Sequence, residues 1–97
     1  MARRIIWSEE AQNDRRLIFS YWNVRNKSNV YSKKLNEQLD KTLLVLCDFP
    51  FIGRPTQKIY VRSKIVLDYL VIYKIFDTKI IVLRIWDSRR NPQKLKY

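Results

Sequence analysis

The sequence lacks several residue types on which common enzyme chemistry depends. It contains no histidine and one cysteine, Cys47. Nucleophile pairs of the Ser–His or Cys–His kind are therefore excluded, as is a zinc site built from four Cys or His ligands. The single glycine, Gly53, leaves no glycine-rich loop for nucleotide phosphates. We expect a protein that uses no metal and no cofactor.

Long hydrophobic runs are also missing. The first residues lack the apolar core of a signal peptide, and no run approaches the roughly 20 apolar residues of a membrane helix. A lone cysteine cannot form an internal disulfide, which is typical of a reducing compartment. We therefore expect a cytoplasmic protein. With 97 residues, 46% of them hydrophobic, a single domain over residues 1–97 is expected.

Basic residues are in large excess. The chain has 20 Lys and Arg against 9 Asp and Glu, a formal net charge of +11. So strong a positive field on a small protein predicts an acidic partner: nucleic acid, an acidic protein segment, or both.

The first half of the chain has the spacing of one short strand and two helices. Residues 4–7 are β-branched and aromatic, which predicts a strand. Ser8 is a good helix cap, and the helix after it should end near Arg25. A second helix follows the break at residues 26–29 and ends before Pro50 and Gly53. So short a break predicts an antiparallel hairpin. The expected apolar faces are Ala11, Ile18, Tyr21 and Trp22 in the first helix, and Tyr31, Leu35, Leu39, Thr42, Leu46 and Phe49 in the second.

The second half has the composition of strands. Residues 58–62 alternate, residues 65–76 are almost continuously apolar, and residues 80–86 follow a turn at 77–79. The order β-α-α-β-β-β predicts an α+β fold in which the helical hairpin packs on one face of a small, largely antiparallel sheet. The other face of the sheet should be partly open.

Arginine, lysine and tyrosine remain as the functional side chains. Arginine neutralises phosphates and stabilises charge that develops in phosphoryl transfer, and such groups can bind RNA with or without cutting it. Arg62, Arg89 and Arg90 are the candidates for catalysis. The candidates for binding are Lys58, Tyr60, Tyr73, Arg84, Trp86 and Tyr97. Each also has a structural interpretation, as a solvated strand end, a charged turn or a core aromatic.

Several stretches together resemble the RelE/ParE superfamily of toxins from bacterial type II toxin–antitoxin pairs. They are residues 7–11 (WSEEA), 49–55 (FPFIGRP), 61–62 (VR), 68–73 (DYLVIY) and 81–92 (IVLRIWDSRRNP). The resemblance spans nearly the whole chain, and the β-α-α-β-β-β order is that of the family. It implies a growth-inhibiting toxin that a separate antitoxin protein holds inactive.

The resemblance implies two possible targets. ParE-like members poison DNA gyrase, and the long helical hairpin with its Pro-x-x-Gly-Arg-Pro exit at residues 50–55 is similar to theirs. RelE-like members cut mRNA on the ribosome without a metal, and there Arg62, Arg89, Arg90 and Tyr97 match basic or aromatic positions. Leu70 stands where those nucleases have a second-strand arginine, and the histidine of some members is absent. We expect gyrase poisoning, with the ribosome-dependent mRNA endoribonuclease as the alternative.

Two other classes remain open. A plain basic nucleic-acid-binding module would bind tightly with a steep salt dependence and without toxicity. A catalytically inactive relative would bind an antitoxin and leave growth unaffected.

Overall fold

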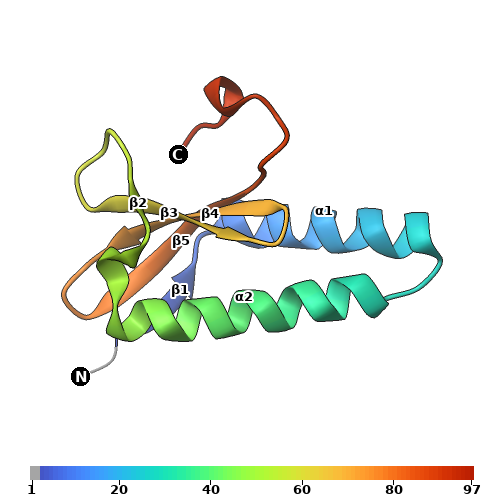
Figure 1. Cartoon of the computed structure of the whole chain (residues 1–97), viewed down its shortest axis with the longest axis horizontal. Helices are drawn as coiled ribbons and strands as arrows, with labels where there is room; N and C mark the ends of the chain where they lie inside the picture. The colour runs from blue at the N-terminus through green and yellow to red at the C-terminus, as the bar shows by residue number, and fades with distance from the viewer. Residues whose placement is uncertain (1–2) are drawn as a thin grey trace.

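Two helices pack against one face of a five-stranded sheet (Figure 1). The computed structural model describes residues 3–97. The sheet has the strand order β1-β5-β4-β3-β2, in which β1 runs parallel to β5 and the other neighbours are antiparallel. The predicted α+β fold is confirmed. The elements in chain order are β1 (Arg4–Trp7), α1 (Glu9–Asn26), α2 (Val30–Asp48), the 3-10 turn η1 (Pro50–Ile52), β2 (Arg54–Pro55), β3 (Val61–Val66), β4 (Tyr69–Ile75), β5 (Lys79–Asp87) and the 3-10 turn η2 (Pro92–Lys94).

Helix α1 begins where its cap predicts. The Ser8 hydroxyl accepts a hydrogen bond from the Ala11 backbone N–H at 3.0 Å. The helix ends at Asn26, after which Lys27 adopts a left-handed conformation. Ala11 is fully buried, but Tyr21 is 55% exposed. The prediction that Tyr21 belongs to the buried face is therefore wrong, because Tyr21 borders an open pocket between α1 and the sheet.

Helix α2 supplies most of the helical part of the core. Its buried apolar face carries Leu35, Leu39, Leu43 and Leu46. Phe49, predicted to continue this face, is 62% exposed because the helix stops one residue before it. The helices run antiparallel, as predicted (Figure 1). Neither helix has the length and apolar composition needed to cross a membrane.

The apolar run at residues 65–76 is two strands and not one. Strand β3 ends at Val66 and β4 starts at Tyr69, so a two-residue turn separates them. Leu67 in this turn has a φ of 53°, a left-handed conformation that is uncommon for leucine. The turn contains none of the glycine, proline or asparagine that would have revealed it.

The predicted strand at residues 58–62 is mostly a turn. Tyr60 has a φ of 61°, which breaks extended backbone, and β3 begins only at Val61. Ile59 is 79% exposed, so the alternation that predicted a strand does not correspond to a buried face.

The two faces of the sheet are covered by different parts of the chain. Tyr69, Val71, Tyr73 and Ile75 of β4 belong to the core cluster beneath the helices. The opposite face is crossed by the C-terminal segment, residues 88–97, which lies on the side away from α2 (Figure 1). Ile72 and Trp86 are only 2% and 6% exposed. The face that was predicted to be partly open is therefore covered at Ile72 and Trp86.

Candidate functional site

A pocket of about 340 Å³ opens between α1 and the end of β5. We call it the exit pocket. It contains four of the predicted site residues, because α1 and the final strand run beside each other at this edge of the sheet. The lining residues are Asp14, Leu17, Ile18, Tyr21, Tyr69, Arg84, Ile85, Trp86, Asp87, Arg89 and Arg90.

Arg84 ties the strand to the helix. Its Nε and Nη2 donate to the two carboxylate oxygens of Asp14 at 2.7 and 3.1 Å. The Ile85 backbone N–H donates to the same carboxylate at 3.0 Å. The hydrogen bond to Asp14 raises the pKa of Arg84 further above its usual value. Arg84 is therefore engaged inside the chain and is not free for a partner.

Arg89 is also paired, whereas Arg90 is not. The Arg89 guanidinium contacts the Asp87 carboxylate at 2.9 Å, and this hydrogen bond lowers the pKa of Asp87. Arg90 lies over the ring of Trp86, 4.5 Å from the ring centroid. Within residues 3–97, Arg90 has no carboxylate partner. It is the one arginine of the exit pocket whose charge an outside acidic group can neutralise.

Trp86 is placed differently from the prediction that its ring binds a partner. Trp86 is only 6% exposed, and the guanidinium of Arg90 lies over its ring. Its indole Nε1 has no hydrogen-bond partner within residues 3–97. The indole ring of Trp86 thus packs against Arg90, and this face of the ring is not exposed for stacking with a base.

Arg62 lies on the helix face of the sheet, in β3 between the edge strand β2 and β4. Its register partner is Tyr73, a core residue, so both side chains point toward the helices. The guanidinium donates to the backbone carbonyls of Phe51 and Gly53 at 2.9 and 2.8 Å. Arg62 thus holds the η1 turn against the sheet and is not a solvated strand-end arginine; its catalytic role stays a prediction.

Tyr73 is fully buried beside Arg62, with 0% exposure. Its hydroxyl donates to the Pro50 carbonyl at 2.7 Å and accepts from the Gly53 N–H at 3.1 Å. Burial raises its pKa. A Cβ at Gly53 would lie 2.2 Å from the Tyr73 hydroxyl, so the only glycine is needed for this close approach. Tyr73 is a core residue whose hydroxyl is engaged inside the chain, and its role in binding stays a prediction.

The structure does not bring the three candidate catalytic arginines together. Arg62 is opposite Tyr73 on β4, whereas Asp87, next to the Arg89–Arg90 pair, is opposite Tyr69. Four residues of a strand span about 13 Å. Arg62 and the pair therefore sit at opposite ends of β4.

The remaining predicted residues lie where the C-terminal segment meets the sheet. The Lys58 amine contacts the Tyr97 carbonyl and lies 4.9 Å from the centroid of the Tyr97 ring. Arg84 donates to the Lys96 carbonyl at 2.9 Å. Tyr60, 59% exposed, stands in the turn before β3. Lys58 and Tyr97 thus meet each other.

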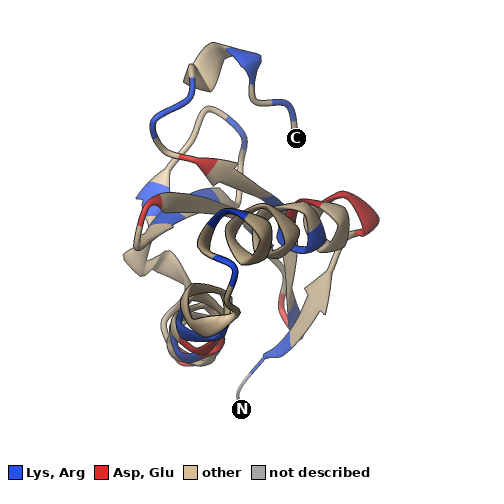
Figure 2. Cartoon of the chain, turned by 90° about the vertical axis from the view of Figure 1, so that its right-hand side faces the viewer, with Lys and Arg blue, Asp and Glu red and all other residues tan. Residues whose placement is uncertain are grey.

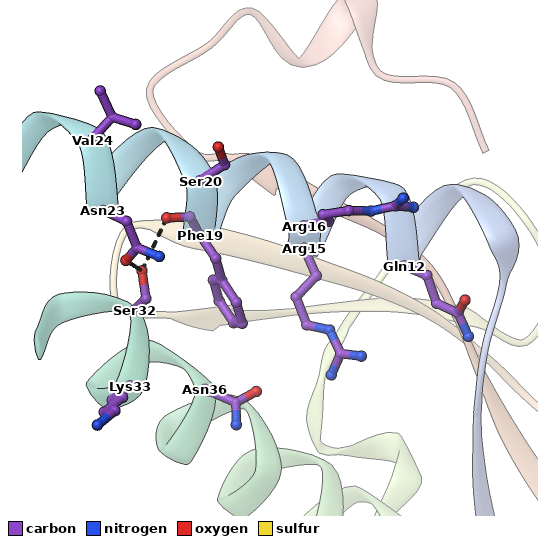
Figure 3. Close-up of a pocket in the computed structure, with 10 residues that line it drawn as sticks. All are labelled: Gln12, Arg15, Arg16, Phe19, Ser20, Asn23, Val24, Ser32, Lys33 and Asn36. Carbon is purple, nitrogen blue, oxygen red and sulfur yellow. Dashed lines mark hydrogen bonds between the residues drawn. The ribbon is translucent and has the colours of Figure 1, made fainter. Parts of the chain in front are cut away.

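A second cavity, of about 870 Å³, lies between α1 and α2 and was not predicted from the sequence. We call it the interhelix groove (Figure 3). Its lining is basic, and Arg15, Arg16 and Lys33 contribute its cations. Basic residues also occur on the C-terminal segment (Figure 2). One pattern in the sequence could have indicated this groove: polar residues 12, 16 and 23 are spaced so that they lie on one side of the first helix. Within residues 3–97 no cluster of acidic, Cys or His side chains could hold a metal ion.

Comparisons with known proteins identify the family. Residues 5–92 match the family described as ParE toxin of type II toxin-antitoxin system, parDE. The fold is similar to a chain of the chromosomal ParDE toxin–antitoxin system from P. aeruginosa, with a TM-score of 0.74 and 17% identity over 91% of this chain and 98% of that one. A chain of the E. coli DinJ-YafQ toxin–antitoxin complex gives a TM-score of 0.61 and 18% identity over 90% and 93%. None of the curated proteins matches. The chain therefore belongs to the ParE toxin family of type II toxin–antitoxin systems.

Proposed function

We propose that this ParE-family toxin arrests growth by poisoning DNA gyrase. The observation that carries the proposal is the match to the ParE toxin family over residues 5–92, which is nearly the whole chain. The arrangement of the arginines supports it, because they are placed to hold the fold and to contact a protein and are not gathered for cleavage of RNA.

Four features argue against a nuclease. Arg62 donates to two backbone carbonyls, so its charge is not directed at a substrate phosphate. Its position lies about 13 Å along β4 from the Arg89–Arg90 end, so the strand register does not place the three arginines side by side. Leu70 occupies the position at which the nuclease branch has an arginine. The chain has no histidine to serve as a proton acceptor.

We propose further that a separate antitoxin neutralises the toxin with an acidic, partly apolar segment. The chain has a net charge of +11, and complementary charge steers and orients association. At the exit pocket, Leu17 and Tyr21 are 60% and 55% exposed beside the unpaired Arg90. Apolar anchors next to a free cation match such a segment in chemistry.

The target is tested with purified gyrase, supercoiled plasmid and ATP. After treatment with detergent and protease, the toxin should leave linear plasmid, the product of a trapped cleavage complex. The Arg90→Ala variant should weaken this effect if the exit pocket contacts the target. The Lys41→Ala variant, which removes one charge from the exposed side of α2, is its matched control.

A translating extract provides the opposing test. If the toxin is a ribosome-dependent nuclease, mRNA is cut within minutes at codon boundaries, and only while it is translated. Cut mRNA together with unaffected gyrase would contradict the proposed target. Co-expression with the acidic product of a neighbouring reading frame should restore growth in cells that produce the toxin.

A further inference from the structure

The interhelix groove has a lining unlike that of the exit pocket. None of its ten lining residues is acidic, although the chain carries nine Asp and Glu. Three are cationic, five carry an amide or hydroxyl, and only Phe19 and Val24 are apolar. The polar members are Gln12, Arg15, Arg16, Ser20, Asn23, Ser32, Lys33 and Asn36. Most of its lining residues therefore carry hydrogen-bond donors of positive or neutral charge, although more of the exposed surface of the groove is apolar than polar.

The cations of the groove are not neutralised inside the chain. The ion pairs found in residues 3–97 are Arg84–Asp14 and Arg89–Asp87, and neither involves the groove. Arg15 lies over the ring of Trp7, 4.2 Å from the ring centroid, which leaves its guanidinium charged and held in place. The positive charge of the groove is thus available to an anionic ligand.

The groove is also formed before any ligand binds. The Ser32 hydroxyl donates to the Asn23 side-chain oxygen at 2.6 Å and lies 3.2 Å from the Phe19 carbonyl, and Ser32 itself is 5% exposed. This contact joins α1 to α2 at the closed end of the groove. Arg15 and Phe19 point from α1 toward α2, with Asn36 opposite them (Figure 3). Donors held in position lower the entropy lost on binding.

We propose that the interhelix groove binds one strand of nucleic acid, with phosphates against Arg16 and Lys33. Amides, hydroxyls and cations are the side chains that contact phosphate and sugar oxygens. Phe19 lies among them, and an aromatic ring stacks on the face of an unpaired base. A docked protein helix would need a row of apolar anchors, which two apolar lining residues do not supply. This binding goes beyond the proposed action on gyrase and does not depend on it.

The test measures binding of fluorescent oligothymidylate and oligouridylate to the purified chain by anisotropy at several salt concentrations. In the double variant Arg16→Ala/Lys33→Ala, two phosphate contacts are lost. Since each contact on a single strand contributes about 0.7 to the slope of log K against log salt, the slope should fall by about 1.4. Affinity at low salt should fall with it.

The matched control is Lys34→Ala/Lys41→Ala, which removes the same number of positive charges, both of them from α2. At 3.6 residues per turn, Lys34 and Lys41 lie on a neighbouring side of α2, about a quarter of a turn from Lys33 and further from Asn36, and neither lines the groove. This variant should keep the slope of the unaltered chain. Circular dichroism verifies that both variants fold.

Three results would overturn the inference. One is an equal loss in the two double variants, which would mean that net charge alone drives binding. Another is no binding of either oligonucleotide. The third is a polyglutamate peptide that displaces the oligonucleotides at lower concentration than unlabelled strand, which would assign the groove to an acidic protein segment. A preference between the two oligonucleotides tells whether the strand is DNA or RNA.

Discussion

The two faces of the sheet are stabilised in contrasting ways. Beneath the helices, Leu35, Leu39 and Tyr73 are at most 1% exposed and interlock with the strands. On the other face, the C-terminal segment is attached through exposed contacts, among them Arg84 to the Lys96 carbonyl and Lys58 to the Tyr97 carbonyl. Apolar burial stabilises far more than exposed polar contacts do. We therefore expect the helix face to contribute more to the stability of the domain than the contacts of the C-terminal segment do.

The difference is sharpest in the arginines. Arg62, on the helix face, donates to two backbone carbonyls, whereas Arg90, beyond the end of β5, only lies over an aromatic ring. Side chains of the same type thus serve the fold in one region and remain available to a partner in the other. The following changes test that contrast.

The largest effect should come from Leu39→Ala. Leu39 is 1% exposed in the centre of the helix-face core, so its truncation leaves a cavity. We expect the free energy of unfolding to fall by about 2–5 kcal/mol. Urea denaturation followed by circular dichroism measures it. Leu44→Ala is the control, since Leu44 is 68% exposed on the same helix and should change stability little. Equal losses in both would contradict the placement of the core.

Tyr73→Phe should have the next largest effect. It removes the hydroxyl that accepts from Gly53 N–H and donates to the Pro50 carbonyl, and it leaves both backbone groups buried without a partner. The expected loss of unfolding free energy is about 1–3 kcal/mol. Tyr60→Phe, at an exposed position, serves as the control. A variant that melts normally and loses binding would restore Tyr73 to the list of contact residues.

Arg62→Ala should destabilise moderately. Two hydrogen bonds from a charged donor disappear, and one of them is exposed, so we expect a loss of roughly 1–2 kcal/mol. Arg90→Ala should leave the melting temperature nearly unchanged while it weakens partner binding. The contrast between the two faces fails if Arg62→Ala melts normally and Arg90→Ala does not.

Removal of residues 94–97 should have a smaller effect on stability. The contacts that are lost, Arg84 to Lys96 and Lys58 to Tyr97, are exposed. The midpoint of urea unfolding should shift less than in Arg62→Ala, and the transition should stay cooperative. A shift as large as that of Leu39→Ala would show that both faces are equally important for stability.

The smallest effect should be a pH dependence at Asp87. The Arg89 hydrogen bond lowers the folded-state pKa of Asp87 below its unfolded value, so the pair stabilises the fold above the unfolded pKa. That contribution is lost as the pH falls through the folded pKa. Arg89 is largely exposed, so solvent screens the pair and the effect is small. In Asp87→Asn, the melting temperature should therefore fall slightly less steeply as the pH is lowered. The melting temperatures of the variant and the unaltered chain should converge at low pH. Parallel profiles would argue against the pair.

Sequence patterns predicted the helical half of the fold more accurately than the sheet. Ser8 caps α1 because its hydroxyl bonds locally, and the apolar period of α2 is long enough to be unambiguous. The Leu67 turn could not be found, because a leucine with positive φ is stabilised by the strands on each side and not by its own preference. The alternation of residues correctly predicted that Arg62 and Val61 point to different faces of the sheet. Which of those two faces lies beneath the helices depends on the tertiary packing.

The predicted site was recovered in part for a related reason. Arg84, Trp86, Arg89 and Arg90 line one pocket because they follow one another along the chain. The partners that engage Arg84 and Arg62, Asp14 and the η1 carbonyls, are distant in sequence. The interhelix groove combines two helices and therefore could not appear in either one alone.

The side chains of Ser8 and of Asp14 in α1 form hydrogen bonds with the backbone of β5, and these bonds affect how the sheet edge can pair with another chain. Strand β1 pairs with β5 only as far as Val82, so the rest of β5 would present an unpaired edge. The Ser8 hydroxyl donates to the Leu83 carbonyl and Asp14 accepts from the Ile85 N–H, which occupies this edge. At the opposite edge, β2 ends with Pro55, which has no N–H to offer. A second copy of the chain thus finds these particular groups already bonded or missing, which disfavours strand pairing at these positions.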